Sequence, residues 1–103
     1  MDLPKKATAT IATERAERFA KQFISHWGRE TKVESDGSST IMKFDAVGDW
    51  PATAVRVETR TTELIITAWA EDAAGLEKNC ASIAEHLHRF AGRREVLTID
   101  WLD

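Results

Sequence analysis

The sequence is poor in cysteine, proline and tyrosine. Its 103 residues include one cysteine, two prolines and no tyrosine. One cysteine cannot form an internal disulfide, which excludes the small secreted domains that disulfide bridges hold together. The first residues also lack the apolar stretch of a secretory signal. We therefore expect a protein of a reducing compartment, with a cytoplasmic location.

An excess of basic residues and a long apolar run are also missing. The chain has 14 lysines and arginines against 17 aspartates and glutamates, and its net charge is −3. A general nucleic-acid surface needs a clear basic excess, so we expect no nucleic-acid partner. No apolar segment approaches the roughly 18 residues of a membrane-spanning helix, so we expect no membrane association.

The composition that remains is typical of one soluble globular domain. Hydrophobic residues make up 43% of the chain and charged residues 30%, which excludes a disordered tail. A chain of this length closes a single hydrophobic core. We expect one domain over residues 1–103, in which residues 1–6 form a loose leader.

The second half of the chain contains a long amphipathic helix. Asp72 is a suitable N-cap, and Gly92 stands where a left-handed C-cap needs no side chain. Between them, apolar residues recur at steps of three and four: Leu76, Cys80, Ile83, Leu87 and Phe90. After Gly92 the period changes to two, which predicts a strand over Val96–Trp101.

A second amphipathic helix lies near the N-terminus. Thr13 is its predicted N-cap and Gly28 its predicted end. Its apolar face carries Phe19, Phe23, Ile24 and Trp27. A short edge strand over residues 7–12 comes before it.

Four strands are predicted between the helices, over residues 31–34, 40–44, 52–59 and 63–70. Asp36, Gly37 and Ser38 form a turn signal between the first two. The resulting order is β-α-β-β-β-β-α-β. Because no helices separate the middle strands, we predict an α+β fold, with an antiparallel β-sheet and two helices packed on one face.

Two segments resemble a known bacterial family. The first is Ala-Thr-Glu-Arg-Ala-Glu-Arg-Phe at residues 12–19, which continues through Gln22 to Ser-His-Trp at residues 25–27. The second is His-Leu-His-Arg-Phe-Ala-Gly-Arg-Arg-Glu at residues 86–95. Both resemble the family called domain of unknown function 2218, in the same order and over nearly the whole chain. Gly92 and Arg94 replace an aromatic and an acidic residue of the family pattern.

The resemblance implies a bacterial cytoplasmic domain with no assigned activity. Relatives occur beside, or fused to, flavin-dependent siderophore-interacting proteins. The implied setting is iron–siderophore handling, and the implied partner is such a protein or a small-molecule ligand. Neither the resemblance nor the residues indicate a cofactor.

Two histidines at the edges of the apolar stripes are the first candidate site residues. His26 flanks the stripe of the first helix, and His86 lies three residues after Ile83 on the second. If the helices pack side by side, the two imidazoles meet at their seam, where they could bind a ligand or transfer protons. The alternative is that each ring packs at the edge of the core and hydrogen-bonds a neighbour.

The other candidates are arginines and aromatic residues. Phe90 would line the same pocket as the histidines, between helices and sheet, with Arg89 and Arg93 at its rim. With Arg94, Arg15 and Arg18, these arginines could bind an anion, although a helix C-terminus alone explains three of them. Trp50, in a loop before a proline, would contact a ligand or partner, or else cover the core edge.

The spacing argues against a metal site. His86 and His88 are two residues apart on a helix and project to different sides, as do Cys80 and His86. No Cys-x-x-Cys or His-Glu-x-x-His motif exists. We expect no metal, and we expect Cys80 to be a small buried residue of the apolar stripe.

Three functional hypotheses remain. The first is a small non-enzymatic binding or accessory domain whose candidate ligand-binding residues are His26, His86, Arg89, Phe90, Arg93 and Trp50. The second is a small enzyme in which His26 and His86 act as an acid/base pair. The third is a homodimeric interaction module that associates through the sheet face or an edge strand.

Overall fold

The computed structural model describes residues 3–27 and 32–102. Within them the chain forms five strands and two helices: β1 (Lys5–Ala12), α1 (Ala16–Trp27), β2 (Lys32–Asp36), β3 (Ser39–Phe44), β4 (Thr53–Thr59), β5 (Glu63–Ala70) and α2 (Ala73–Ala91). The strands form one sheet in the order β1-β5-β4-β3-β2, and every neighbouring pair is antiparallel. The predicted α+β fold is confirmed.

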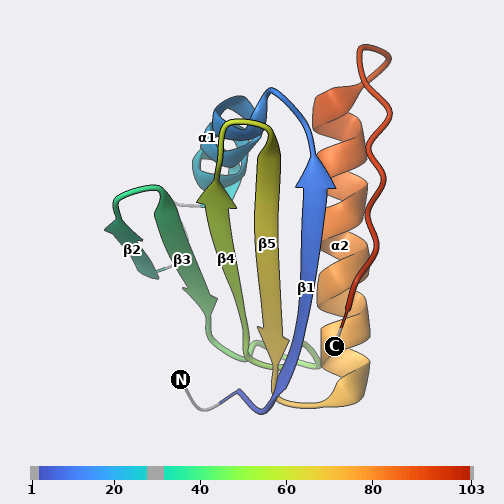
Figure 1. Ribbon diagram of the computed structural model, residues 1–103. Coiled ribbons are helices and arrows are strands. Elements are labelled where there is room, and N and C mark those ends of the chain that lie inside the picture. The colour runs from blue at the N-terminus through green and yellow to red at the C-terminus, as the bar shows by residue number, and fades with distance from the viewer. Residues whose placement is uncertain (1–2, 28–31, 103) are drawn as a thin grey trace.

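Both helices cover the same face of the sheet (Figure 1). Helix α1 packs against β4 and β5, and helix α2 packs mainly against β5 and β1. Burial alternates along β5, where Leu64, Ile66, Ala68 and Ala70 are buried and the residues between them are partly exposed. The core therefore lies between this face and the helices, with Phe19 and Phe23 among its largest buried side chains. Each contributes roughly 1.5–3 kcal/mol through burial.

The predicted N-terminal boundaries shift by two or three residues. Strand β1 begins at Lys5, because Lys5 and Lys6 pair with Ala70 and Trp69, so the leader expected over residues 1–6 is shorter. Helix α1 begins at Ala16 instead of directly after Thr13, whose Oγ1 accepts a hydrogen bond from the Arg15 amide in the preceding turn. The predicted helix end at Gly28 and strand start at residue 31 lie outside the described residues.

Helix α2 has both caps that its sequence predicts. The Asp72 carboxylate accepts a 2.6 Å hydrogen bond from the Gly75 amide. Gly92 adopts φ 59°, and its amide donates to the His88 carbonyl. The turn between β2 and β3 is also as predicted, with Gly37 at φ 60°.

The C-terminal segment differs from its prediction. Residues 96–101 are extended but form no regular strand, and the segment joins the sheet only at an isolated bridge between Thr8 and Leu102. It runs beside α2 (Figure 1), and Ile99 and Trp101 line the same hollow as Leu76 of that helix. The alternation of residues thus predicted a strand that the structure does not contain. It could not indicate that the segment would be held by side chains that pack on α2 and by one bridge to β1.

Gly75 lets the loop before β4 approach α2. A Cβ atom on Gly75 would lie 2.6 Å from Cγ of Pro51 and 3.0 Å from Oδ1 of Asp72. Both distances are shorter than a normal van der Waals contact, so only glycine fits without a shift. The contact anchors the loop that carries Trp50 to the first turn of the helix.

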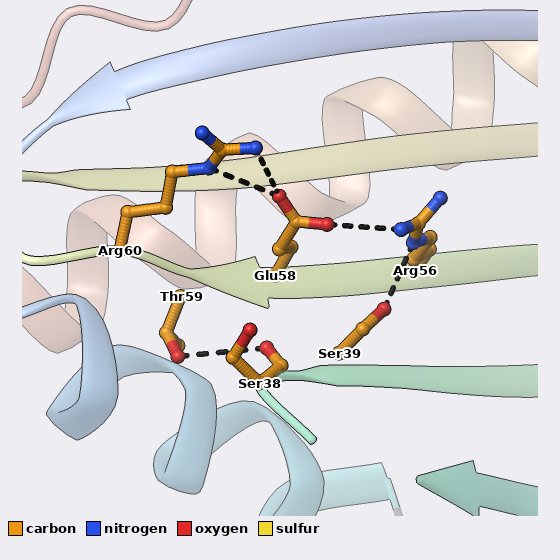
Figure 2. A network of polar contacts seen from close by, with 6 residues as sticks. All are labelled: Ser38, Ser39, Arg56, Glu58, Thr59 and Arg60. Carbon is orange, nitrogen blue, oxygen red and sulfur yellow. Dashed lines mark hydrogen bonds and ion pairs between the residues drawn. The ribbon is translucent and has the colours of Figure 1, made fainter. Parts of the chain in front are cut away.

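On the other face of the sheet, which neither α1 nor α2 covers, lies a polar network (Figure 2). The Glu58 carboxylate accepts hydrogen bonds from Arg56 and from Arg60, each at 2.9 Å, and Arg56 also donates to Ser39 Oγ at 2.8 Å. The hydrogen bonds from Arg60, with the charges of both arginines, lower the pKa of Glu58 against the opposing effect of desolvation. Beside this network, the register places Ile65, Thr67 and Trp69 on the uncovered face.

We predict that Gly75→Ala destabilises the protein. Helix propensity alone would stabilise the variant by up to about 1 kcal/mol, whereas the contact with Pro51 should cost about 1–3 kcal/mol. Urea denaturation of Gly75→Ala, Pro51→Ala and the double variant measures the coupling. In the double variant the alanine at 51 has no Cγ, so part of the stability should return. A more stable Gly75→Ala would show that the contact does not matter.

The Glu58 network predicts a pH dependence of stability. Because the folded-state pKa is lowered, the contribution of Glu58 is fully present above the unfolded-state value of about 4.3 and is lost as the pH falls through the folded-state value. For such a surface network we expect at most about 1 kcal/mol. Unfolding free energies between neutral and acidic pH should show that Glu58→Gln removes this dependence. Glu63→Gln, a strand carboxylate without an ion pair among the described residues, is the control.

Candidate functional site

The two candidate histidines meet at the seam of the helices, as the stripe positions predict. The ring centroids of His26 and His86 are 4.8 Å apart. The Trp27 ring lies 4.6 Å from His86 and 5.2 Å from His26, so it contacts both imidazoles. Phe90 completes the cluster at 6.4 Å from His26 and 6.3 Å from His86. His26 is exposed, whereas His86 is half-buried.

A backbone hydrogen bond determines which nitrogen of His86 carries the proton. Nδ1 of His86 lies 2.7 Å from the carbonyl oxygen of Ser82, one turn earlier on α2. A carbonyl oxygen can only accept, so Nδ1–H is the donor. In the neutral ring Nε2 is then the nitrogen with a free lone pair, available to accept a proton or a hydrogen bond.

An open groove of about 810 Å³ runs along α1 beside this pair. Its lining comes mostly from the exposed side of α1, with one residue from α2: Glu17, Arg18, Lys21, Gln22, Ser25, His26 and Phe90. A hollow does lie between the helices and the sheet, beside Trp27 and Ile83, but it contains none of the residues predicted to line it. Phe23 is fully buried in the core and lines neither that hollow nor the groove.

Gln22 is the groove residue that the sequence did not indicate. Its side-chain oxygen Oε1 is buried and has no hydrogen-bond partner among the described residues. A buried acceptor without a donor costs about 1–3 kcal/mol. Gln22 also lines the groove, so a rotation of its side chain would bring this acceptor to a ligand. Its only sequence signal was its place beside Phe23 in the first family-like segment.

Arg89 and Arg93, which were both predicted at the rim of the histidine pocket, lie in different places. Arg89 forms an exposed ion pair with Glu85, with Nη2 and Oε1 2.6 Å apart, one turn away on α2. It is therefore a helix surface pair and not part of the histidine cluster. Arg93 lies just beyond α2, in a separate hollow that also includes Phe90.

Trp50 lies in another place, at the rim of a smaller hollow of about 320 Å³. The loop around it is closed by two hydrogen bonds between Val47 and Trp50, and Lys78 Nζ sits 5.9 Å from the Trp50 ring centroid. Trp27 lines this hollow as well as touching the histidines. Trp50 thus belongs to the opposite side of the seam from the groove.

Asn79 is a buried polar residue on the apolar side of α2. It is 6% exposed, and its amide donates to the carbonyls of Ala54 at 3.3 Å and Trp69 at 3.2 Å. These bonds tie the helix to the backbone of β4 and β5. Sequence reasoning passed over it because its partners lie on strands far away along the chain.

The described residues contain neither a cluster of metal ligands nor a helix that could span a membrane. No group of three or more histidine, cysteine or acidic side chains comes together there in a way that could hold a metal ion. Neither α1 nor α2 combines the length and apolar character that crossing a bilayer requires.

Residues 8–102 match the family described as an uncharacterized protein conserved in bacteria (DUF2218). This chain belongs to that family. The NMR structure of PA4090 from Pseudomonas aeruginosa is similar in fold, with 24% sequence identity, a TM-score of 0.70 and coverage of 94% of both chains. No curated protein gives a significant match. The DUF2218 chain therefore has a family and a fold, and its activity has to be argued from its own geometry.

In this DUF2218 chain the two family-like segments converge. Residues 12–27 form the turn before α1 and the whole helix, and residues 86–95 form the end of α2 and its exit. The ring contacts between His26 and His86, and the 5.5 Å contact between Phe23 and Phe90, join one segment to the other.

We predict that the two histidines differ in their effect on stability. His86→Gln should lower the unfolding free energy by about 1 kcal/mol, because it removes the contact with Trp27 and the bond to Ser82. His26→Gln should change it by less than about 0.5 kcal/mol, because His26 is exposed. Chemical denaturation checks both, with His88→Gln as the exposed control on α2. Equal effects of His86→Gln and His88→Gln would contradict the prediction.

Proposed function

We propose that this chain is a small bacterial binding or accessory domain whose ligand lies in the groove between α1 and the end of α2. The observation that carries the proposal is the pairing of His26 and His86, 4.8 Å apart, beside an open groove. Ligand sites commonly combine an apolar wall with a few convergent polar groups. Here Phe90 is the wall, and Gln22 and His26 supply the polar groups.

The chemistry of the groove favours recognition over catalysis. Oε1 of Gln22 can accept a hydrogen bond, Ser25 can donate or accept one, and His26 is exposed and free to turn toward a ligand. His86 is held by Ser82 and Trp27, so it acts as a support for His26. A planar ligand with hydroxyl groups would pack on Phe90 and satisfy Gln22.

The biological setting in this proposal is iron–siderophore handling, with a flavin-dependent siderophore-interacting protein as partner and a cytoplasmic location. It is supported by the family resemblance alone. Many siderophores carry catechol groups, which are planar and have two hydroxyl donors. Dihydroxybenzoate is therefore a suitable probe, alone and as its ferric complex.

We predict saturable binding of dihydroxybenzoate in isothermal titration calorimetry. His26→Ala should weaken it about threefold to tenfold, the equivalent of one hydrogen bond. His88→Ala, an exposed histidine on α2, should leave it unchanged. A ferric complex that binds more tightly than the free catechol would favour the siderophore setting. No saturable binding of either form would contradict the choice of ligand, and equal loss in both variants would contradict the site.

An acid/base enzyme is the second candidate, and the free Nε2 of His86 next to His26 favours it. A proton-transfer pair needs two titratable groups within reach of one substrate. One experiment distinguishes the enzyme from the binding domain. If the chain is an enzyme, His26→Gln and His86→Gln would abolish turnover of a bound compound while its binding remained.

A homodimer is the third candidate, and the uncovered sheet face favours it. Ile41, Ile65 and Trp69 are only partly exposed on that face, and no helix of the described chain covers it. Strand β2 is also at the edge of the sheet, where unpaired backbone groups can pair with a second copy. Light scattering after size-exclusion chromatography measures the oligomeric state, and a monomer at high concentration would rule out the homodimer.

A further inference from the structure

Four arginines line one hollow of about 270 Å³ at the end of the helix pair. Arg15 and Arg18 come from the start of α1, and Arg93 and Arg94 follow the end of α2. These two helix ends lie at the same end of the molecule, at the top of Figure 1. Phe90 forms part of the wall. Chain segments more than 70 residues apart thus place four positive charges around one space.

None of these four arginines forms an ion pair within residues 3–27 and 32–102. Their neighbour Arg89 does, with Glu85. This concentration of positive charge in a chain of net charge −3 attracts anions.

The helix dipoles explain only half of the cluster. Arg93 and Arg94 follow the C-terminus of α2, where positive side chains are favourable. Arg15 and Arg18 stand at the N-terminus of α1, where the dipole is positive and another positive charge is unfavourable. Glu14 and Glu17 flank these arginines, but none of the ion pairs in the described residues joins them. The start of α1 itself attracts an anion.

We infer that this hollow binds the phosphate group of a small organic phosphate. The inference rests on the proposed function only in that the groove binds a ligand, and it replaces the catechol with an organic phosphate. Guanidinium groups match phosphate oxygens in pairs, and four of them exceed what a single carboxylate can use. Arg18 and Phe90 line both the hollow and the groove. The hollow and the groove are therefore adjacent, with Arg18 and Phe90 between them, and the organic part of the ligand lies across Phe90 toward His26.

The size of the hollow and the overall charge favour a small molecule over a nucleic acid. The hollow, at about 270 Å³, is slightly smaller than the usual ligand-pocket range of about 300–1,000 Å³ and suits a compact group such as phosphate. The groove beside it contains Glu17 as well as Lys21, so the positive surface does not continue along it. A nucleic-acid backbone would need such a continuous track.

The test is a titration of the whole chain with phenyl phosphate, inorganic phosphate and phenol at fixed ionic strength. We expect phenyl phosphate to bind most tightly and inorganic phosphate more weakly. Arg18→Gln should weaken phenyl phosphate binding at least about tenfold, the equivalent of one charge-assisted hydrogen bond. The double variant Arg93→Gln/Arg94→Gln should do the same. Arg89→Gln, at the same end but paired with Glu85, is the matched control.

Stability in the absence of phosphate gives a second readout. If the arginines only stabilised the fold, Arg18→Gln would lower the melting temperature. We expect the variant to melt at the same or a higher temperature than the parent, because the substitution relieves repulsion. Phosphate should raise the melting temperature of the parent and not that of the variant.

Several results would overturn the inference. These are no saturable binding of either phosphate, equal loss in Arg89→Gln and Arg18→Gln, or tighter binding of a single-stranded oligonucleotide than of phenyl phosphate. Arginine-dependent binding in which inorganic phosphate equals phenyl phosphate would support the anion site and remove the proposed groove. Binding of phenol equal to that of phenyl phosphate would support the groove and overturn the anion site.

Discussion

The contact between the end of α1 and the second half of α2 is the constraint on which the candidate site depends. Phe23 meets Phe90 edge-on at 5.5 Å, His26 meets His86 at 4.8 Å, and Trp27 lies against His86. Phe23 is fully buried, so it cannot move without exposing the core. The core therefore determines where the more exposed rings lie, and through them the shape of the groove.

Two contacts on the sheet side of α2 hold this helix–helix contact in place. The Asn79 side chain donates hydrogen bonds to two strand carbonyls, which fixes the position of α2 relative to the sheet. Because Gly75 has no side chain, Pro51 can pack against it, and this contact fixes the loop that carries Trp50. The tightly packed contacts thus lie between the helices and the sheet, whereas the exposed polar groups that a ligand could reach lie on the outer side of the helices. This separation is common in binding domains, because a rigid scaffold keeps a site preorganised.

Charge is distributed unevenly around this scaffold. On the uncovered sheet face Arg56 and Arg60 share the Glu58 carboxylate, and on α2 Arg89 pairs with Glu85. At the end of the helix pair the arginines have no such acid among the described residues. Of the seven arginines in the described residues, three are paired with an acid, and the four that are not all lie at this one end. Composition alone cannot show this cluster, because the net charge of the chain is negative.

The sequence by itself determined the two amphipathic helices, the run of four strands and the caps Asp72 and Gly92, because period and cap chemistry are local properties. It also placed His26 and His86 at the edges of facing stripes. Only the tertiary structure decided that the pocket is an open groove outside the helices, that Arg89 is paired, and that Arg15 faces the same space as Arg93. These outcomes depend on contacts between residues far apart in the chain, and periodicity carries no information about such distances.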